Sequence, residues 1–524
     1  MDKNLILHGI MNQHERISIK IKIVILLIAV FNVVFHLFFI NNLEYHRDEL
    51  LYFSLGQHPG LGYATVPPMI GWIAWLMQDI FGYSLFAVRL FPALLSGFMV
   101  ILVSDLTRQL GGGKYAMILA GTGIVISIFG LRTFFLFQPV HIDLIFWTLT
   151  FYMIIKYITS ENDKYLVLPG IIAGLSVLNK YLIGLLFIII LLVVPFTNYR
   201  TIFRKKMFWY GIAAGFVVFL PNLIWQITNG LPVINHLSDL AESQLVNVDR
   251  SAFLMEQILM PGAASFLTIA GLFYVMLNKK MRKFRFLGAV AVIVIVTLMI
   301  MRGKSYYTQG IFPFLISAGA VFYESLFSKW HTRLVFAVVL ITIAVYLLPF
   351  GLPVYRTRGL IKYFNMVETR TGADFGRTYE DGTKHSLPQD YADMLGWEEL
   401  TEITARAWEM IQDKKAACIY CENYGQAGAV TIIGKKYGLP EAVSFHESFR
   451  YWKPEKFDPD ITSLIYINDE LGEDVQIVFR KITAVGSISD PDAREFGTTV
   501  WLCREPAGSF NEFWTERLKM LESE

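Results

Sequence analysis

Residues 21–40 read IKIVILLIAVFNVVFHLFFI, and residues 43–53, just after them, read LEYHRDELLYF. The first stretch is apolar over about the 20 residues that a helix needs to cross a bilayer. The second stretch crowds carboxylates and basic side chains into a few helical turns. Since no small-residue cleavage site follows, we interpret the first stretch as a retained span rather than a removed signal peptide. The expected fold therefore begins with a membrane-crossing helix that delivers a charged segment to one face of the bilayer.

The whole chain shares this apolar character. Of its 524 residues, 54% are hydrophobic, 15% are aromatic and 17% are charged, and the mean hydropathy is +0.46. These values exclude an ordinary soluble protein and indicate a polytopic α-helical membrane protein, with the lipid bilayer as its surroundings. The formal net charge of +2 is spread along the chain, so no nucleic-acid partner is expected. Three cysteines, all after residue 417, exclude a disulfide framework.

Hydropathy predicts eleven transmembrane helices, near residues 21–40, 88–107, 116–136, 140–158, 165–179, 182–197, 208–227, 261–277, 286–301, 308–325 and 333–351. Segments rich in Lys and Arg recur between alternate spans, as KYITSENDK, NYRTIFRKK, NKKMRKFR and SKWHTR. The positive-inside rule places these segments in the cytoplasm. We therefore predict a multi-pass protein of the cytoplasmic membrane with a cytoplasmic N-terminus and an extracytoplasmic C-terminus.

The composition divides the chain near residue 351. Residues 1–351 are expected to form the transmembrane domain, whose first outer loop, residues 41–87, has helical apolar spacing typical of interfacial helices. Residues 352–524 are richer in charge and turn residues, and they alternate helical stretches with the short strands AACIY, SLIYIN, VQIVF and TVWLC. This alternation predicts a C-terminal extracytoplasmic α/β domain.

Carboxylates mark the outer ends of two predicted spans. Asp48 and Glu49 follow the first span. At that position a carboxylate that faces a partly dehydrated cleft can keep a pKa suited to proton transfer. The neighbouring His46 could orient a substrate that bears hydroxyl groups, although an acidic pair can also simply mark a membrane boundary. Asp143 lies near the start of the fourth span, either as a helix N-cap or as a group that faces a cavity.

Three cations lie on the predicted outer side, against the charge bias that orients the other loops. Lys180 occurs in LNKYLIG, and Arg302 and Lys304 occur in MRGKSYYTQG. Their position predicts a local anion, for which a lipid-linked phosphate at headgroup level is suitable. Tyr306 and Tyr307 follow directly, as phosphate or sugar contacts or as part of an aromatic belt. Lys180 could alternatively extend its side chain to the interface without binding a ligand.

The C-terminal part contains three further motifs. The pair CIYC (Cys418 and Cys421) has no second pair, which argues against a zinc site. The glycines of YGQAGA, which follow a strand and open a helix, are interpreted as close-packing positions rather than a nucleotide-binding turn. SFHESFRYW (444–452) is a loop that could reach over the membrane cleft toward an acceptor.

These residues together resemble a known family. The segments HRDELLYFSLGQHPGLGYATVPPMIGW, GLSVLNKY and GKSYYTQGIFPFLISAGA occur in the order seen in bacterial glycosyltransferases of family 39. Those are multi-span GT-C enzymes similar to dolichyl-phosphate-mannose–protein mannosyltransferases and to the lipid A aminoarabinose transferase. The shared pattern is an Asp–Glu pair after the first span, followed by Gly–Tyr and Pro–Pro steps, here ending in Tyr63, Pro67 and Pro68.

The resemblance implies an inverting transfer of a sugar from a polyprenyl-phosphate-linked donor to an acceptor outside the cytoplasmic membrane. It implies Asp48 as general base, with Glu49 and Asp143 either positioning the acceptor or holding the loop. No cofactor is expected, although a divalent metal between Asp48 and Asp143 stays open. Where the aminoarabinose transferase group has a phosphate-binding lysine before Pro–Pro, this chain has Val66. The donor sugar and the acceptor therefore cannot be taken from the relatives.

Two other classes of protein are considered. A lipid or solute transporter, or a flippase, would also be polytopic, but transporters usually show inverted repeats and ionisable groups near the bilayer midplane. Here the ionisable residues gather at one boundary and no repeat is evident. A membrane-anchored sensor with a ligand-binding outer domain would leave the long first loop unexplained. The sequence therefore favours the transferase.

Overall fold

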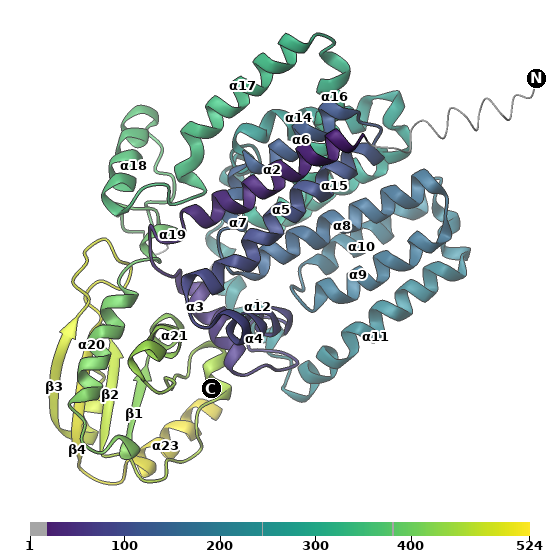
Figure 1. Cartoon of the computed structure of the whole chain (residues 1–524). Coiled ribbons are helices and arrows are strands. Elements are labelled where there is room, and N and C mark those ends of the chain that lie inside the picture. The colour runs from purple at the N-terminus through teal and green to yellow at the C-terminus, as the bar shows by residue number, and fades with distance from the viewer. Residues whose placement is uncertain (1–17, 244, 380–381, 524) are drawn as a thin grey trace, which may run out of the picture.

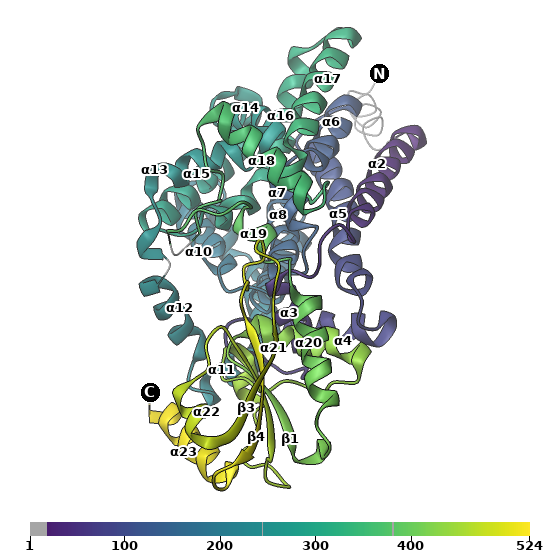
Figure 2. The same ribbon diagram turned by 90° about the vertical axis from the view of Figure 1, so that its left-hand side faces the viewer.

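The computed structural model describes residues 18–523 except 244, 380 and 381, and it has two parts (Figure 1). One part is a block of long apolar helices. The other is a small sheet with its own helices, formed by the end of the chain. Figure 2 shows that the first outer loop lies between these two parts.

The helical block follows the predicted spans closely. Its main helices are α2 (Ile19–Phe38), α5 (Leu85–Gln109), α6 (Lys114–Val125), α8 (Pro139–Ser160), α9 (Val167–Val177), α10 (Ile183–Val193), α11 (Lys206–Thr228), α14 (Ser265–Leu277), α15 (Arg285–Ile300), α16 (Phe312–Leu326) and α17 (Trp330–Leu347). Among the described residues, six helices are long and apolar enough to cross a membrane, or seven if a bent pair is one span. Several predicted spans are shorter or broken, so the number of crossings stays a prediction.

Two predicted spans illustrate why the helices are shorter than expected. The span near 116–136 divides into α6 and α7 (Ile128–Thr133), because Ser127 caps α7 through the Gly130 amide. The span near 261–277 continues from α13 (Arg250–Leu259) through an 88° bend. Polar caps and turns inside an apolar stretch therefore change the direction of the chain without changing its hydropathy.

Small residues let the membrane helices approach closely. A Cβ added to Gly170 of α9 would lie 2.1 Å from the carbonyl oxygen of Gly211 in α11, and one added to Gly174 would lie 2.4 Å from that of Gly215. Such small-residue contacts replace the hydrophobic driving force that lipid surroundings remove. These glycines hold α9 against α11, and with α9 they hold the turn after it, which carries Lys180.

The first outer loop contains two helices, α3 (Arg47–Ser54) and α4 (Met69–Phe81), joined through η1 (Leu55–Gln57). One face of α4 packs inward while its large apolar side chains on the other face are exposed: Trp75, Leu76, Ile80 and Phe81. This distribution agrees with the predicted interfacial helix. Its position in the membrane interface stays a prediction.

The C-terminal part contains α18 (Thr357–Thr371), α19 (Gln389–Ala392), α20 (Trp397–Glu409), α21 (Tyr424–Ile432), α22 (Glu473–Val478) and α23 (Phe510–Ser523). Its strands are β1 (Ala417–Cys421), β2 (Ser463–Asn468), β3 (Phe479–Ser487) and β4 (Thr499–Pro506), in the order β1-β2-β4-β3. The β1–β2 pair is parallel and the other pairs are antiparallel. A small α/β sheet is thus present as predicted, with one correction: most of VQIVF forms α22, and the strand starts at its last residue.

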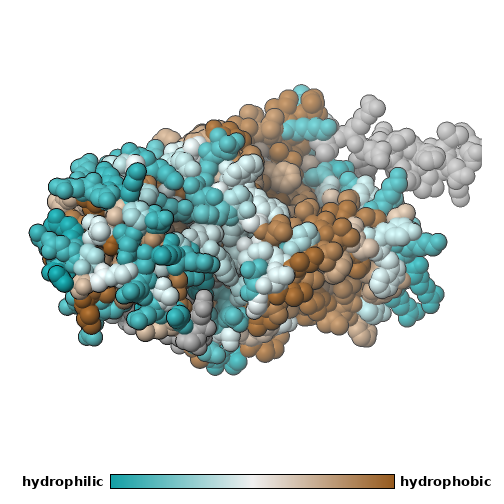
Figure 3. All heavy atoms as spheres, turned by 90° about the horizontal axis from the view of Figure 1, so that it is seen from below, coloured by the Kyte–Doolittle hydropathy of each residue, from teal (hydrophilic) through white to brown (hydrophobic). Residues whose placement is uncertain are grey.

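One hydrophobic core extends across the predicted boundary at residue 351. It combines residues of the first outer loop, such as Leu50 and Phe53, with residues of α20 and α21, such as Leu400 and Val430. A second core lies within the helical block and a third between the sheet and α23. In Figure 3 the hydrophobic surface gathers over the helical block and the hydrophilic surface over the part with the sheet. The C-terminal part is therefore packed onto the outer loop.

Candidate functional site

Asp48 is held by one hydrogen-bond donor on each side of its carboxylate. The side-chain amide of Gln138, at the start of α8, donates to Oδ2 at 3.0 Å. The Tyr424 hydroxyl, from α21, donates to Oδ1 at 2.9 Å. The Asp48 side chain is half-buried, and its own backbone amide donates to His46 Nδ1. Each carboxylate oxygen keeps a second lone pair. The carboxylate is thus oriented but still able to accept a proton.

Glu49, the next residue, has a structural environment. Its side chain is fully buried, and Arg89 of α5 donates to it through Nε at 3.2 Å and through a terminal nitrogen at 2.8 Å. The backbone amides of His46 and Phe137 also donate to it. Burial alone would raise the pKa of Glu49, but Arg89 and these hydrogen bonds outweigh burial and lower it. Of the two roles considered for Glu49, the geometry supports holding the loop.

His46 has a capping role. Its Nδ1 accepts from the Asp48 amide at the start of α3, and its Nε2 lies 3.9 Å from carboxylate oxygens of both Asp390 and Asp393. The side chain is 4% exposed. His46 therefore fixes the orientation of α3 against the C-terminal part and has little surface for a substrate.

Lys180 lies beside a second set of predicted residues, namely Asp143, Tyr306 and Tyr307. Its ammonium lies 5.2 Å from the ring centroid of Tyr306 and 4.9 Å from that of Tyr307, as cation–π contacts. Its charge also interacts with that of Asp143, which is 5% exposed and accepts from Trp147. Lys180 thus contacts protein groups rather than extending freely to the interface. Asp143 is not an N-cap, because α8 starts at Pro139 with Gln138 as its cap.

The tyrosine pair connects this set with Asp48. Tyr306 lies within electrostatic range of Tyr52 and of Asp48, while its ring contacts Tyr307 at 4.7 Å between centroids. Burial, followed by the Asp48 carboxylate, raises the pKa of Tyr52 well above its ordinary value. The structure therefore brings together carboxylates and a cation that are distant in the sequence.

The other two predicted cations differ from each other. The charge of Lys304 acts on Lys180, and burial together with Lys304 lowers the pKa of Lys180 although Asp143 opposes that shift. Two nearby ammonium groups favour an anion between them. Arg302 is exposed, adopts a positive φ of 55° and donates to the Val246 carbonyl. Arg302 therefore does not join the Lys180 cluster.

The predicted loop residues Tyr63, Pro67 and Pro68 are buried parts of the scaffold. The Tyr63 hydroxyl donates to the His58 carbonyl at 3.1 Å and accepts from the Gly60 amide. Pro68 precedes α4, whose first amide, that of Met69, donates to the Leu178 carbonyl at 3.0 Å. The Pro–Pro step thus fastens the outer loop to the turn that carries Lys180.

A second carboxylate approaches Asp48 from the C-terminal part. Glu447 has a positive φ of 53°, and its Oε2 accepts from the Thr65 hydroxyl at 2.6 Å. Burial, together with the charge of Asp48, raises the pKa of Glu447 against the opposing effects of Thr65 and Arg450. The loop 444–452 therefore contacts the first outer loop, and its reach toward an acceptor stays a prediction.

Several of these site residues were not predicted. Arg89 has a recognisable signal, because a cation within the first turns of an apolar span requires a partner. Gln138 precedes Pro139 in a typical helix start, but its contact with Asp48 depends on the fold. Tyr424 lies in the segment YGQAGA, in which the sequence pattern singles out only the glycines, as close-packing positions. No local pattern indicates that this tyrosine meets α3.

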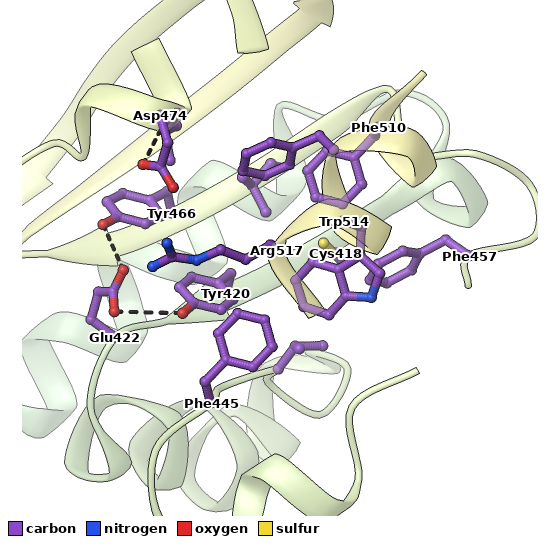
Figure 4. A pocket seen from close by; sticks show the side chains of 14 residues that line it. Cys418, Tyr420, Glu422, Phe445, Phe457, Tyr466, Asp474, Phe510, Trp514 and Arg517 are labelled. Atoms are coloured by element: carbon purple, nitrogen blue, oxygen red, sulfur yellow. Dashed lines mark hydrogen bonds between the residues drawn. The ribbon is translucent and has the colours of Figure 1, made fainter. Parts of the chain in front are cut away.

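No group of three or more His, Cys, Asp or Glu side chains suited to a metal was found among the described residues. The three cysteines are buried and free, so CIYC forms neither a disulfide nor a cysteine–histidine cluster. Figure 4 shows a separate pocket between the sheet and α23, where Glu422 accepts from Tyr466 and Tyr420. This pocket belongs to the third hydrophobic core and lies apart from Asp48.

Sequence comparisons agree with the resemblance. Residues 65–225 match the family described as dolichyl-phosphate-mannose-protein mannosyltransferase. The lipid A galacturonosyltransferase RgtD of Rhizobium johnstonii is 25% identical over 320 residues, which are 58% of this chain and 66% of the relative. The match thus spans slightly less than two thirds of the relative's length. The matched family segment includes Pro67, Pro68, Asp143 and Lys180 and starts after Asp48.

Solved structures show the same fold. ArnT from Cupriavidus metallidurans bound to undecaprenyl phosphate has a TM-score of 0.60 at 14% identity, covering 92% of this chain and 97% of that chain. Its apo state has a TM-score of 0.53 at 13% identity, covering 88% and 93%. The predicted GT-C resemblance and fold class are therefore confirmed. By sequence the chain is similar to glycosyltransferases, and by fold it is similar to ArnT.

Proposed function

We propose that this protein transfers a sugar from a polyprenyl-phosphate-linked donor to an acceptor on the outer face of the cytoplasmic membrane. The observation that carries the proposal has two parts, the oriented carboxylate of Asp48 and the Lys180 ammonium beside Tyr306 and Tyr307. Tyr306 connects them, because it lies within electrostatic range of Asp48. A transferase of this kind needs both, because one group accepts the proton of the acceptor and the other stabilises the phosphate that leaves.

The proposed reaction is a single displacement. The acceptor hydroxyl oxygen attacks the anomeric carbon of the donor, and its proton passes to Asp48. The bond from that carbon to the phosphate oxygen breaks, and the electron pair stays with the polyprenyl phosphate. Attack from the side opposite the leaving group inverts the anomeric configuration. Asp143 is buried and interacts electrostatically with Lys180, so we assign it the role of holding the Lys180 ammonium in place.

Lys180 and Lys304 are the proposed phosphate ligands, with Tyr306 and Tyr307 as hydroxyl donors beside them. The bound undecaprenyl phosphate of the related ArnT structure supports a polyprenyl-phosphate carrier. The names of the sequence relatives make galacturonic acid and mannose the first sugars to test. The displacement itself uses no redox step and no cofactor, so none is proposed.

The proposed orientation follows from the charge distribution. The Lys- and Arg-rich loops would face the cytoplasm together with the N-terminus, and Asp48, Lys180 and the C-terminal part would face the outside. This places the site at the outer headgroup level, where a lipid-linked donor presents its phosphate.

Purified protein in lipid nanodiscs tests the proposal. It would be given undecaprenyl phosphate carrying radiolabelled galacturonic acid or mannose, with lipid A as acceptor. We expect label to move to the acceptor and undecaprenyl phosphate to be released in equal amount. If no label moves while the donor lipid crosses between leaflets of proteoliposomes, the protein is a flippase and the proposal is wrong.

A further inference from the structure

The C-terminal part contacts the candidate base directly. α21 packs on α3 so closely that a Cβ added to Gly428 would lie 2.8 Å from the Leu50 side chain and 3.0 Å from the Leu50 carbonyl oxygen. Figures 1 and 2 both show α21 beside α3. The first residue of α21 is Tyr424, and this packing brings its hydroxyl to Asp48.

The ring of Tyr424 is fixed from both parts of the molecule. From α3, the Arg47 guanidinium lies 4.5 Å from the ring centroid. From the C-terminal part, Asn423 caps α21 by accepting from the amides of Gly425 and Gln426. Arg47 also pairs with Glu495 at 3.7 Å. A ring held by these contacts loses little further freedom when its hydroxyl bonds to Asp48.

The hydrogen bond has a defined direction. Burial, followed by the Asp48 carboxylate, raises the pKa of Tyr424 well above its ordinary value, so the hydroxyl stays protonated and donates. A donor to a carboxylate favours the ionised form, which is the form that can accept a proton. Without Tyr424, Gln138 would be the side chain left holding the carboxylate, through Oδ2 alone.

We infer that the C-terminal part completes the catalytic site, with Tyr424 as a positioning residue that holds the Asp48 carboxylate ready for the acceptor. The inference rests on the proposed function of Asp48 as the base. It gives the C-terminal part a role in catalysis itself: the base has its full set of hydrogen-bond donors only when α21 is docked on α3.

Tyr424→Phe is the direct test, because it removes the hydroxyl and keeps the ring beneath Arg47. Using the nanodisc assay with the galacturonic acid and mannose donors, we expect kcat to fall about 10- to 100-fold, the range for losing a hydrogen bond to a charged group. The acid limb of the kcat–pH profile should move to higher pH, since the ionised carboxylate loses a donor. Binding of undecaprenyl phosphate, measured by native mass spectrometry, should not change.

Tyr437→Phe is the matched control. It removes a hydroxyl that donates to Glu402 in the same part of the chain, away from Asp48, and should leave kcat and the pH profile as in the wild type. A Tyr424→Phe enzyme with lower kcat but an unmoved acid limb would reduce Tyr424 to a structural residue and overturn the inference. Wild-type behaviour of Tyr424→Phe alongside an inactive Asp48→Asn enzyme would also overturn it, while the proposed function would stand.

A double-mutant cycle tests the contact without any substrate. Melting temperatures of Asp48→Asn, Tyr424→Phe and the double variant should be non-additive, because the two side chains share one hydrogen bond. Additive shifts would show that the contact is not formed in the membrane. If Asp48→Asn retained full transfer activity, the proposed function itself would fail, whatever Tyr424→Phe does.

Discussion

Asp48 and Glu49 are neighbours in the chain but have opposite surroundings. Successive residues of a helix point about 100° apart, so α3 directs one carboxylate toward Gln138 and Tyr424 and the other into the core. The core carboxylate meets Arg89, which is 1% exposed, and the other meets two neutral donors. A buried ion pair fixes the helix, and a half-buried carboxylate with free lone pairs can take a proton.

The Glu49–Arg89 pair should make stability depend on pH. Glu49 has a lowered pKa in the folded protein, so its stabilising contribution is present above the ordinary value of 4.5 and is lost as pH falls through the lowered folded value. Glu49→Gln should cost about 3–5 kcal/mol at neutral pH, because Arg89 is left buried without its partner. Melting curves in detergent between pH 7 and acid pH check both effects. A variant as stable as the wild type at neutral pH would contradict this account of the pair.

Lys180 should determine donor affinity. Lys180→Met keeps the apolar stem and removes the charge, and we expect undecaprenyl phosphate to bind about 10- to 100-fold more weakly. Arg302→Met is the comparison, because Arg302 lies outside the cluster and should change binding far less. Native mass spectrometry with a lipid titration measures both. Equal losses in the two variants would remove Lys180 from the proposed phosphate site.

At the scale of elements, the contact between α21 and α3 joins the C-terminal part to the first outer loop. Gly428→Val should force these helices apart, because the added Cβ overlaps the Leu50 backbone. We expect a lower melting temperature and reduced transfer. Gly508→Ala is the control, since a Cβ there meets nothing within 4 Å. Unchanged melting of Gly428→Val would show that the two helices are not packed as described.

The elements also show what the sequence can predict. The long spans follow from hydropathy alone, because crossing a bilayer requires about 20 apolar residues whatever they pack against. The roles of the caps could not be predicted in the same way: Asp143 looks like a cap, but Gln138 and Pro139 begin the helix one turn earlier. VQIVF looks like a strand and is mostly a helical turn, since its pattern suits either.

At the scale of the molecule, the candidate site could be predicted only in part. The charges on the first outer loop and on the turn with Lys180 can be recognised from the sequence as candidate site residues, because they lie where membrane proteins avoid charge. The contact between Asp48 and Tyr424 joins residues 376 positions apart, so no local pattern encodes it. It depends on the shared hydrophobic core between the outer loop and the C-terminal part.

That shared core predicts that residues 1–351 alone are unstable. Without α20 and α21, the apolar side chains of α3, including Leu50 and Phe53, would be exposed to water. Truncation after residue 351 should therefore give aggregated protein in fluorescence-detected size-exclusion chromatography, whereas the full chain should elute as a single peak. A monodisperse truncated protein would show that the first outer loop folds without its C-terminal cover.

The Asp48→Asn variant tests the central claim most directly, when transfer and lipid binding are measured on the same nanodisc sample. The substitution keeps the side-chain shape and removes the ability to take up the acceptor proton. We predict that undecaprenyl phosphate still binds as in the wild type, while sugar transfer falls by about 10²- to 10⁴-fold, the contribution of a general base. Transfer at the wild-type rate by Asp48→Asn would contradict the account.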